Sequence, residues 1–145
     1  MKVYLDTNIL AAASSREHRH HAQSLDLLKA VKEGAMEAYI STHGLAEFYS
    51  VLTRTPFTPR VHPAEAGRFL DDNVLPYFHV VALSAADYKA VLRSCANAGV
   101  IGGAVFDALH LHCAEKAGCD RIYTFNVRDF RLLGPTSLTD KIAAP

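Results

Sequence analysis

The triplet Asp6-Thr7-Asn8 directly follows the first apolar segment of the chain, Val3-Tyr4-Leu5. We predict that this segment is a short buried strand, so the triplet places a carboxylate, a hydroxyl and an amide at its carboxyl end. Ligands of open α/β sheets bind at that end of the strands. A carboxylate at a buried edge is costly unless a cationic group meets it. Asp6 is therefore the first candidate for a residue with a chemical role.

Three further acids are expected at the same edge of the sheet: Glu47, Asp107 and Asp129. Glu47 lies early in the helix predicted after the second strand, Asp107 near the start of the helix before the fourth strand, and Asp129 after the fourth strand. Right-handed crossovers keep all the strands parallel, which brings these positions to the carboxyl edge. Four carboxylates without an obvious basic partner raise one another's pKa. A hard divalent cation bound among the carboxylates would stabilise their ionised forms, so the pattern predicts an Mg²⁺ or Mn²⁺ site.

Such a site is suited to hydrolysis of phosphodiester bonds. A divalent cation acidifies a water molecule and neutralises charge on the phosphate and on the leaving oxygen. Acyl transfer would instead need a serine or cysteine paired with a histidine. Each acid alone has a simpler explanation: a turn cap for Asp6, a solvated helix position for Glu47, a favourable helix-dipole position for Asp107 and a turn for Asp129. Their joint placement favours function.

The elements that position these acids alternate along the chain. We predict strands at Lys2–Leu5, Glu37–Ile40, Phe78–Ala82 and Arg121–Thr124, with a short fifth strand at Ser137–Thr139. We predict a helical turn over Asn8–Ala13, a helix within Ser15–Gly34, and helices over His43–Arg54, Pro63–Asn73, Ala85–Asn97 and Val105–Lys116. This alternation is typical of a parallel sheet that is covered on both faces.

Size and composition set further bounds. A chain of 145 residues, half of them hydrophobic, is expected to form one domain over residues 1–145. No apolar run is long enough to span a bilayer, and Asp6 interrupts any secretory signal pattern. The formal net charge is zero, so no overall field attracts nucleic acid. Three cysteines without CxxC spacing indicate reduced thiols in a cytoplasmic protein rather than a zinc site.

Four segments, taken in order, resemble the PIN-domain family and in particular the VapC-type toxins of bacterial toxin–antitoxin pairs. They are Val3–Leu10, Leu45–Glu47, Phe106–Leu109 and Thr124–Phe130. The resemblance covers nearly the whole chain. It implies a three-layer α/β/α sandwich around a five-stranded parallel sheet with strand order 3-2-1-4-5. It also implies Mg²⁺- or Mn²⁺-dependent cleavage of RNA by an endoribonuclease.

The resemblance also implies roles for individual residues and for partners. Asp6, Glu47, Asp107 and Asp129 would be the catalytic and metal-binding acids, and the polar groups that orient substrate or support the acids would be Thr7, Asn8, Thr124 and Asn126. The family often has another acid where this chain has Asn126, which leaves open whether one or two metal ions bind. A homodimer and an antitoxin that covers the groove are the implied protein partners.

Several histidines have competing interpretations. His18, His20 and His21 could form a metal cluster, but a solvated helix start is the favoured interpretation, and contact with an RNA backbone after protonation is a third. His110 lies about one turn from Asp107 and borders the predicted edge. A core or surface histidine is favoured there over a catalytic one.

Two arginines, Arg54 and Arg60, flank a proline-rich loop. Contacts with phosphate groups would position RNA without specifying its sequence. An ordinary surface loop explains them equally well.

The leading hypothesis is a metal-dependent endoribonuclease, with the metal held by Asp6, Asp107 and Asp129 and by Glu47 directly or through water. In-line attack would leave a 5′-phosphate and a 3′-hydroxyl. One alternative is a catalytically silent module that binds RNA or a protein, favoured by the neutral net charge and by Asn126. Another is a phospho-acceptor domain with Asp6 as the acceptor, although the lysine that such a domain needs is not matched by Lys141. The RNA target is not specified by the sequence.

Overall fold

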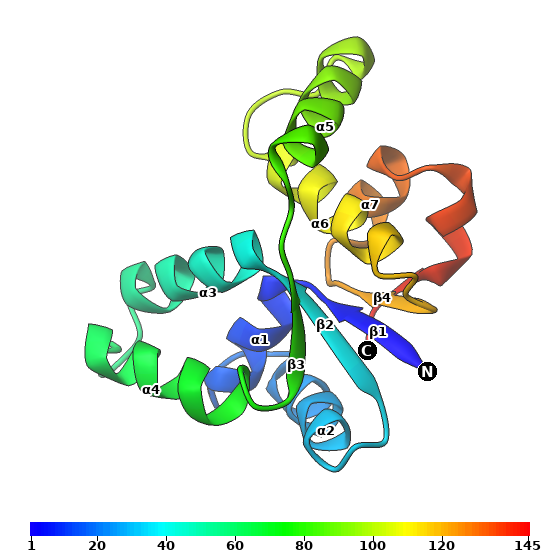
Figure 1. Cartoon of the computed structure of the whole chain (residues 1–145). Coiled ribbons are helices and arrows are strands. Elements are labelled where there is room, and N and C mark those ends of the chain that lie inside the picture. The colour runs from blue at the N-terminus through cyan, green and yellow to red at the C-terminus, as the bar shows by residue number, and fades with distance from the viewer.

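Strand β1 (Lys2–Leu5) is the central strand of a five-stranded sheet in the computed structural model, which describes residues 1–145 (Figure 1). The strand order is β3-β2-β1-β4-β5, and every neighbouring pair is parallel. The central strand is buried on both faces, which explains why Val3, Tyr4 and Leu5 form an uninterrupted apolar run. The predicted strand order is confirmed.

The side chains of β1 alternate between two hydrophobic clusters, as expected for a strand with helices on both faces. Val3 and Leu5 pack into a cluster with residues of helices α1 (Thr7–Ser14), α2 (His21–Lys32), α3 (Thr42–Arg54) and α4 (Pro63–Asn73). Tyr4 packs into the other cluster, with residues of helices α6 (Ala104–Lys116) and α7 (Val127–Leu133). These clusters separate the three layers, so the predicted α/β/α sandwich is confirmed.

The remaining strands are β2 (Glu37–Ser41), β3 (Phe78–Val81), β4 (Arg121–Tyr123) and β5 (Ile142–Ala143). The first four strands agree with the predicted ones to within one residue at each end. The predicted fifth strand, Ser137–Thr139, is wrong. Residues Thr136–Lys141 form a 3₁₀ helix (η1), and the strand that follows pairs with β4 through Ile142. An edge strand here needs an apolar side chain to bury, and Ile142 provides it.

Helix α5 (Ala85–Ala98) packs on α6 on the side away from the sheet (Figure 1). Val91 and Cys95 of α5 contact Leu109 of α6 in a small buried cluster of their own. Helix α7 was not predicted: no side chain caps its start at Asn126. None of the helices combines the length and hydropathy that crossing a bilayer requires.

The start of α3 is held close to the end of β2. The Ser41 hydroxyl accepts a hydrogen bond from the Gly44 backbone N–H at 2.8 Å, which caps the helix. A Cβ atom at position 44 would lie 2.9 Å from Cγ1 of Ile40, so the close approach of helix and strand requires glycine. This contact directs the first turns of α3 along the carboxyl edge of the sheet.

Asp87 ties the start of α5 to α6. Its carboxylate accepts hydrogen bonds from Lys116 Nζ at 2.6 Å and from the Ser84 backbone N–H at 2.7 Å, and it lies 3.1 Å from His112 Nε2. The hydrogen bond from Lys116, followed by that from Ser84, holds the pKa of Asp87 well below its ordinary value. The charged form of this carboxylate is therefore favoured by folding.

We predict that Asp87→Asn lowers the melting temperature at neutral pH and that the difference from the unaltered protein shrinks in acid. The pKa of Asp87 is lower in the folded chain than the value of about 3.9 in the unfolded chain. Its contribution is therefore present above about pH 4 and is lost as the pH falls through the folded value. Thermal unfolding followed by circular dichroism at several pH values measures this. Asp71→Asn, at an exposed aspartate of α4, is the control, and a pH-independent difference for Asp87→Asn would contradict the prediction.

Candidate active site at the carboxyl edge of the sheet

Asp6 lies at the end of β1 with its carboxylate buried. Thr124 Oγ1 donates a hydrogen bond to Asp6 Oδ2 at 2.7 Å, and Thr7 Oγ1 lies 3.3 Å from Asp6 Oδ1. Burial raises the pKa of Asp6, and the charge of His110 and the Thr124 hydrogen bond offset only part of that rise. Hydrogen bonds thus hold the carboxylate in place, but its ionised form is less favoured than it would be in water.

Glu47 lies on α3 and turns its two carboxylate oxygens to different partners. Oε1 accepts a hydrogen bond from Thr7 Oγ1 at 2.7 Å. Oε2 lies 2.9 Å from His43 Nε2 and 3.1 Å from His110 Nε2. Burial by itself would raise the pKa of Glu47, but the hydrogen bond and the charge of His110 lower it to about 2. Glu47 is therefore ionised in this arrangement.

Asp107 lies in the first turn of α6 and is half-buried. Burial, followed by the charges of Asp6, Glu47 and Asp129, raises the pKa of Asp107 to about 6, and His110 offsets part of the rise. Asp129 lies exposed in the first turn of α7 and acts on Asp107 through its charge. The four acids thus share one electrostatic field. Their all-oxygen donor set and mutual repulsion fit a hard divalent cation.

A groove of about 340 Å³ opens over this edge. Asp6, Glu47 and Asp107 line it, whereas Asp129 is not among its lining residues. The three carboxylates are brought to one groove although they come from β1, α3 and α6. As the side chains lie here, no three of the four acids place ligand atoms within 4.8 Å of one another.

Thr124 connects the neutral polar residues of the site. Besides donating to Asp6, its hydroxyl accepts hydrogen bonds from Asn8 Nδ2 at 3.3 Å and from the Asn126 backbone N–H at 3.0 Å. Asn8 in turn accepts one from the Phe125 backbone N–H at 3.3 Å. Asn8, Asn126 and Thr7 line the groove, while Thr124 is buried beneath it. These residues fix the loop after β4 against the end of β1.

His110 lies at the centre of the buried polar contacts of the site, in agreement with the expectation of a core histidine that borders the edge. It is completely buried, with Nε2 3.1 Å from Glu47 Oε2 and 3.8 Å from Asp6 Oδ1, and with Nδ1 2.6 Å from the Tyr4 hydroxyl. Burial lowers the pKa of His110, but the hydrogen bond with Glu47 and the charges of Asp6, Glu47 and Asp107 raise it overall. The expectation that the acids lack a basic partner is therefore wrong.

Helical spacing places both histidines beside an acid. His110 follows Asp107 by three residues, and His43 precedes Glu47 by four, so each histidine shares a helix face with an acid. His43 was not among the candidate residues at all. Its ring stacks on Phe106, with ring centroids 4.9 Å apart and 14° between the planes.

The other basic candidates lie around the groove and do not form a ligand cluster. His18 lines the groove, the His20 ring stacks on Phe125 at 4.2 Å, and His21 Nδ1 bonds the Ala12 carbonyl at 2.9 Å. His20 directly precedes α2, which agrees with the favoured interpretation of a helix start.

Arg54 ends α3, and Arg60 lies in the loop before α4. Both are exposed, and neither pairs with an acid. Their side chains are free to contact a phosphate backbone.

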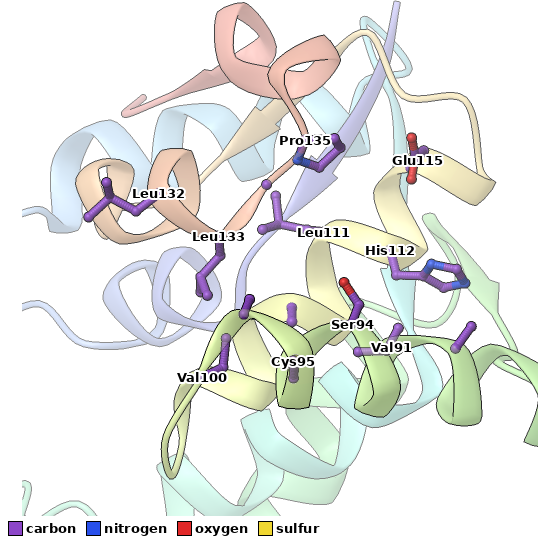
Figure 2. A pocket seen from close by; sticks show the side chains of 14 residues that line it. Val91, Ser94, Cys95, Val100, Leu111, His112, Glu115, Leu132, Leu133 and Pro135 are labelled. Atoms are coloured by element: carbon purple, nitrogen blue, oxygen red, sulfur yellow. The ribbon is translucent and has the colours of Figure 1, made fainter.

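A larger cavity of about 490 Å³ lies between α5, α6 and α7 (Figure 2). Its lining is mainly apolar. The polar side chains are those of Ser94, His112 and Glu115, and His112 and Glu115 lie at the end opposite Leu132 and Leu133 (Figure 2). None of the predicted site residues lines it. Asp6, Glu47 and Asp107 line the smaller groove instead.

We predict that Thr124→Val, which keeps the shape of the side chain, lowers the free energy of unfolding by about 1–3 kcal/mol because it leaves the buried Asp6 carboxylate without its shortest hydrogen bond. Urea denaturation of both proteins measures this. Thr136→Val, at an exposed threonine of η1, is the control and should change stability by no more than about 0.5 kcal/mol. Equal effects of the two substitutions would contradict a specific role for the Thr124 hydroxyl.

Comparisons with known proteins identify the family to which the chain is similar. The PIN domain family profile matches residues 3–134. Ribonuclease VapC40 of Mycobacterium tuberculosis is 32% identical over 113 residues, which cover 78% of each chain. Ribonuclease VapC27 of the same organism is 33% identical over 105 residues, covering 72% of this chain and 71% of the relative.

Solved structures share the fold. VapC20 of M. tuberculosis, described as a toxin that cleaves the sarcin–ricin loop, has a TM-score of 0.66 and 17% identity, covering 86% of this chain and 89% of its own. FitAcB of Neisseria gonorrhoeae has a TM-score of 0.65 and 15% identity, covering 99% of this chain and 96% of its own. With a family match over most of its length and two relatives above 30% identity, this chain belongs to the PIN-domain family, alongside the VapC ribonucleases.

Proposed function

We propose that this protein is a divalent-metal-dependent endoribonuclease and the toxin of a toxin–antitoxin pair. One observation carries the proposal: Asp6, Glu47 and Asp107 line a single groove, and the neighbouring carboxylates help raise the pKa of Asp107 to about 6. Two relatives above 30% identity are named ribonucleases, which supports RNA as the substrate.

Asp6, Glu47, Asp107 and Asp129 would hold Mg²⁺ or Mn²⁺. A bound divalent cation supplies Lewis-acid stabilisation of phosphate charge and a more acidic water molecule. The chain contributes the positioning: Thr124 fixes Asp6, and Thr7 fixes one oxygen of Glu47.

An RNA backbone would lie along the groove. Asn8 and Asn126 line it with neutral amide groups, which donate hydrogen bonds to phosphate oxygens without adding charge. Arg54 and Arg60, both exposed, would contact the backbone outside the groove. In-line attack of water on phosphorus breaks the P–O3′ bond and leaves a 5′-phosphate and a 3′-hydroxyl.

Protein partners belong to the same proposal. An antitoxin would cover the acidic groove and present a basic side chain to it, because an added carboxylate there would be repelled. A second copy of the chain would cover apolar side chains near the α5–α7 cavity, where Ile101 is 87% exposed and Leu132 is 74% exposed. The three free, buried cysteines support a cytoplasmic location.

We predict that Asp6→Asn lowers RNA cleavage in Mg²⁺ or Mn²⁺ by about 100-fold or more, the scale on which loss of one electrostatic group at an active site lowers kcat. The same substitution should weaken Mn²⁺ binding, measured by electron paramagnetic resonance of the free ion. Asp72→Asn, at an exposed aspartate on α4, is the control for both measurements.

Three outcomes separate the hypotheses. Full cleavage by Asp6→Asn rejects the assignment of Asp6. Tight RNA binding without cleavage by the unaltered protein in either metal favours the silent binding module. Labelling of Asp6 by acetyl phosphate, without RNA cleavage, favours the phospho-acceptor.

A further inference from the structure

We propose that His43, Glu47 and His110 form a metal site of their own, which binds a nitrogen-preferring divalent cation such as Zn²⁺. The site uses the imidazoles of His43 and His110, neither of which is a proposed ligand of Mg²⁺ or Mn²⁺. It shares only Glu47 with the acidic residues of the groove.

The three donor atoms are already placed for one ion. All of them lie within 4.8 Å of one another, and the Glu47 Oε2 atom lies 2.9 Å and 3.1 Å from the two Nε2 atoms. Ligand atoms about 2.0–2.1 Å from one Zn²⁺ lie about 3.3 Å apart at a tetrahedral angle. The two distances to Glu47 Oε2 are therefore within about 0.4 Å of the spacing that Zn²⁺ requires, and the two imidazole nitrogens need to approach each other by at most about 1.5 Å.

Two helices supply and orient these donors. His43 and Glu47 are four residues apart on one face of α3, and His110 approaches them from α6. Phe106, one turn before His110, stacks flat on the His43 ring. Glu47 is oriented as well, because Thr7 holds Oε1 and leaves Oε2 directed at the histidines.

The surroundings of His110 are those of a metal-ligating histidine. The Tyr4 hydroxyl donates to Ser41 Oγ at 3.3 Å, so its oxygen can accept a hydrogen bond from His110 Nδ1–H at 2.6 Å. This hydrogen bond keeps one proton on Nδ1. A cation that displaces the proton on Nε2 can then bind the Nε2 lone pair. Metal-binding histidines usually donate their second ring N–H in this way, which fixes the tautomer and the ring orientation.

The donor chemistry selects the class of ion. Imidazole ligands suit Zn²⁺, Ni²⁺ and Cu²⁺, whereas Mg²⁺ prefers carboxylates, carbonyls and water. The site is also open on one side, since the side chains of His43 and Glu47 are 20% and 28% exposed while His110 is fully buried. A fourth position is thus left for water.

Occupation of this site has a consequence that rests on the proposed function. Glu47 Oε2 already faces the imidazoles, and a cation bound there would prevent it from turning toward the groove that Asp6 and Asp107 line. Zn²⁺ would then inhibit Mg²⁺-dependent RNA cleavage, which makes the site a regulatory one.

The binding experiment uses the full chain, stripped of metal with a chelator, and requires no RNA. Zn²⁺ affinity is measured by competition with a chromophoric chelator, and Co²⁺ serves as a spectroscopic probe of nitrogen coordination. We expect one high-affinity Zn²⁺ per chain. His43→Ala and His43→Gln should each weaken Zn²⁺ binding by more than 10-fold, and Tyr4→Phe, which removes the acceptor for Nδ1–H, by about 10-fold. Circular dichroism checks that each variant is folded.

Two controls locate the ion. His79→Ala removes a histidine that also lies beside a glutamate, Glu37 at 3.5 Å, but on the far edge strand β3, and should leave the Zn²⁺ affinity unchanged. Asp129→Asn removes an acid of the groove and none of the three donors, and should also leave it unchanged. Equal Zn²⁺ affinities in His43→Ala and the unaltered protein would overturn the proposal, as would a loss in Asp129→Asn as large as that in His43→Ala. Because RNA cleavage plays no part in these measurements, failure of the zinc site and failure of the nuclease proposal are distinguishable.

Discussion

The burial of the Asp6 carboxylate at the end of β1 is the constraint around which the rest of the site is organised. A carboxylate removed from water is stable only when hydrogen bonds and opposite charge replace its hydration. The chain meets this requirement with the adjacent Thr7 and with residues from two distant segments, Thr124 after β4 and His110 on α6. The loop after β4 and the face that α6 turns to the sheet are thus fixed by one charged group.

Strand β1 is part of the hydrophobic core, and one of its residues, Tyr4, also contacts the candidate active site. Val3 and Leu5 pack under α1, α2 and α3, whereas Tyr4 packs on the other face. The Tyr4 ring belongs to the core, but its hydroxyl reaches both His110 Nδ1 and Ser41 Oγ. Ser41 caps the helix that carries His43 and Glu47. A single buried tyrosine therefore links the packing of the sheet to the positions of the residues at its edge.

The sequence predicted the parts of this structure that depend on periodicity and topology. Four strands, the helices through α6 and the strand order follow from alternating apolar patterns and from the family resemblance. Helix α7 was missed because seven residues without a side-chain cap carry little local signal. His43 was missed for another reason. Spacing shows that two residues share a helix face, but the rotation of α3 and α6 that turns those faces toward each other is set by packing.

Glu47 belongs both to the acidic groove and to the proposed site with His43 and His110. Oε1 of its carboxylate accepts a hydrogen bond from Thr7 at the groove, and Oε2 faces the imidazoles. Its pKa of about 2 keeps it ionised, so it can bind a cation at either site. Two sites that share one ligand are coupled, and the coupling is reciprocal: by whatever factor a cation at the histidines weakens binding at the acids, a cation at the acids weakens binding at the histidines. The strength of that coupling depends on how far Glu47 can turn, and the hydrogen bond from Thr7 limits this rotation. Thr7, a residue adjacent to the buried Asp6 in sequence, thereby governs how strongly the two sites compete.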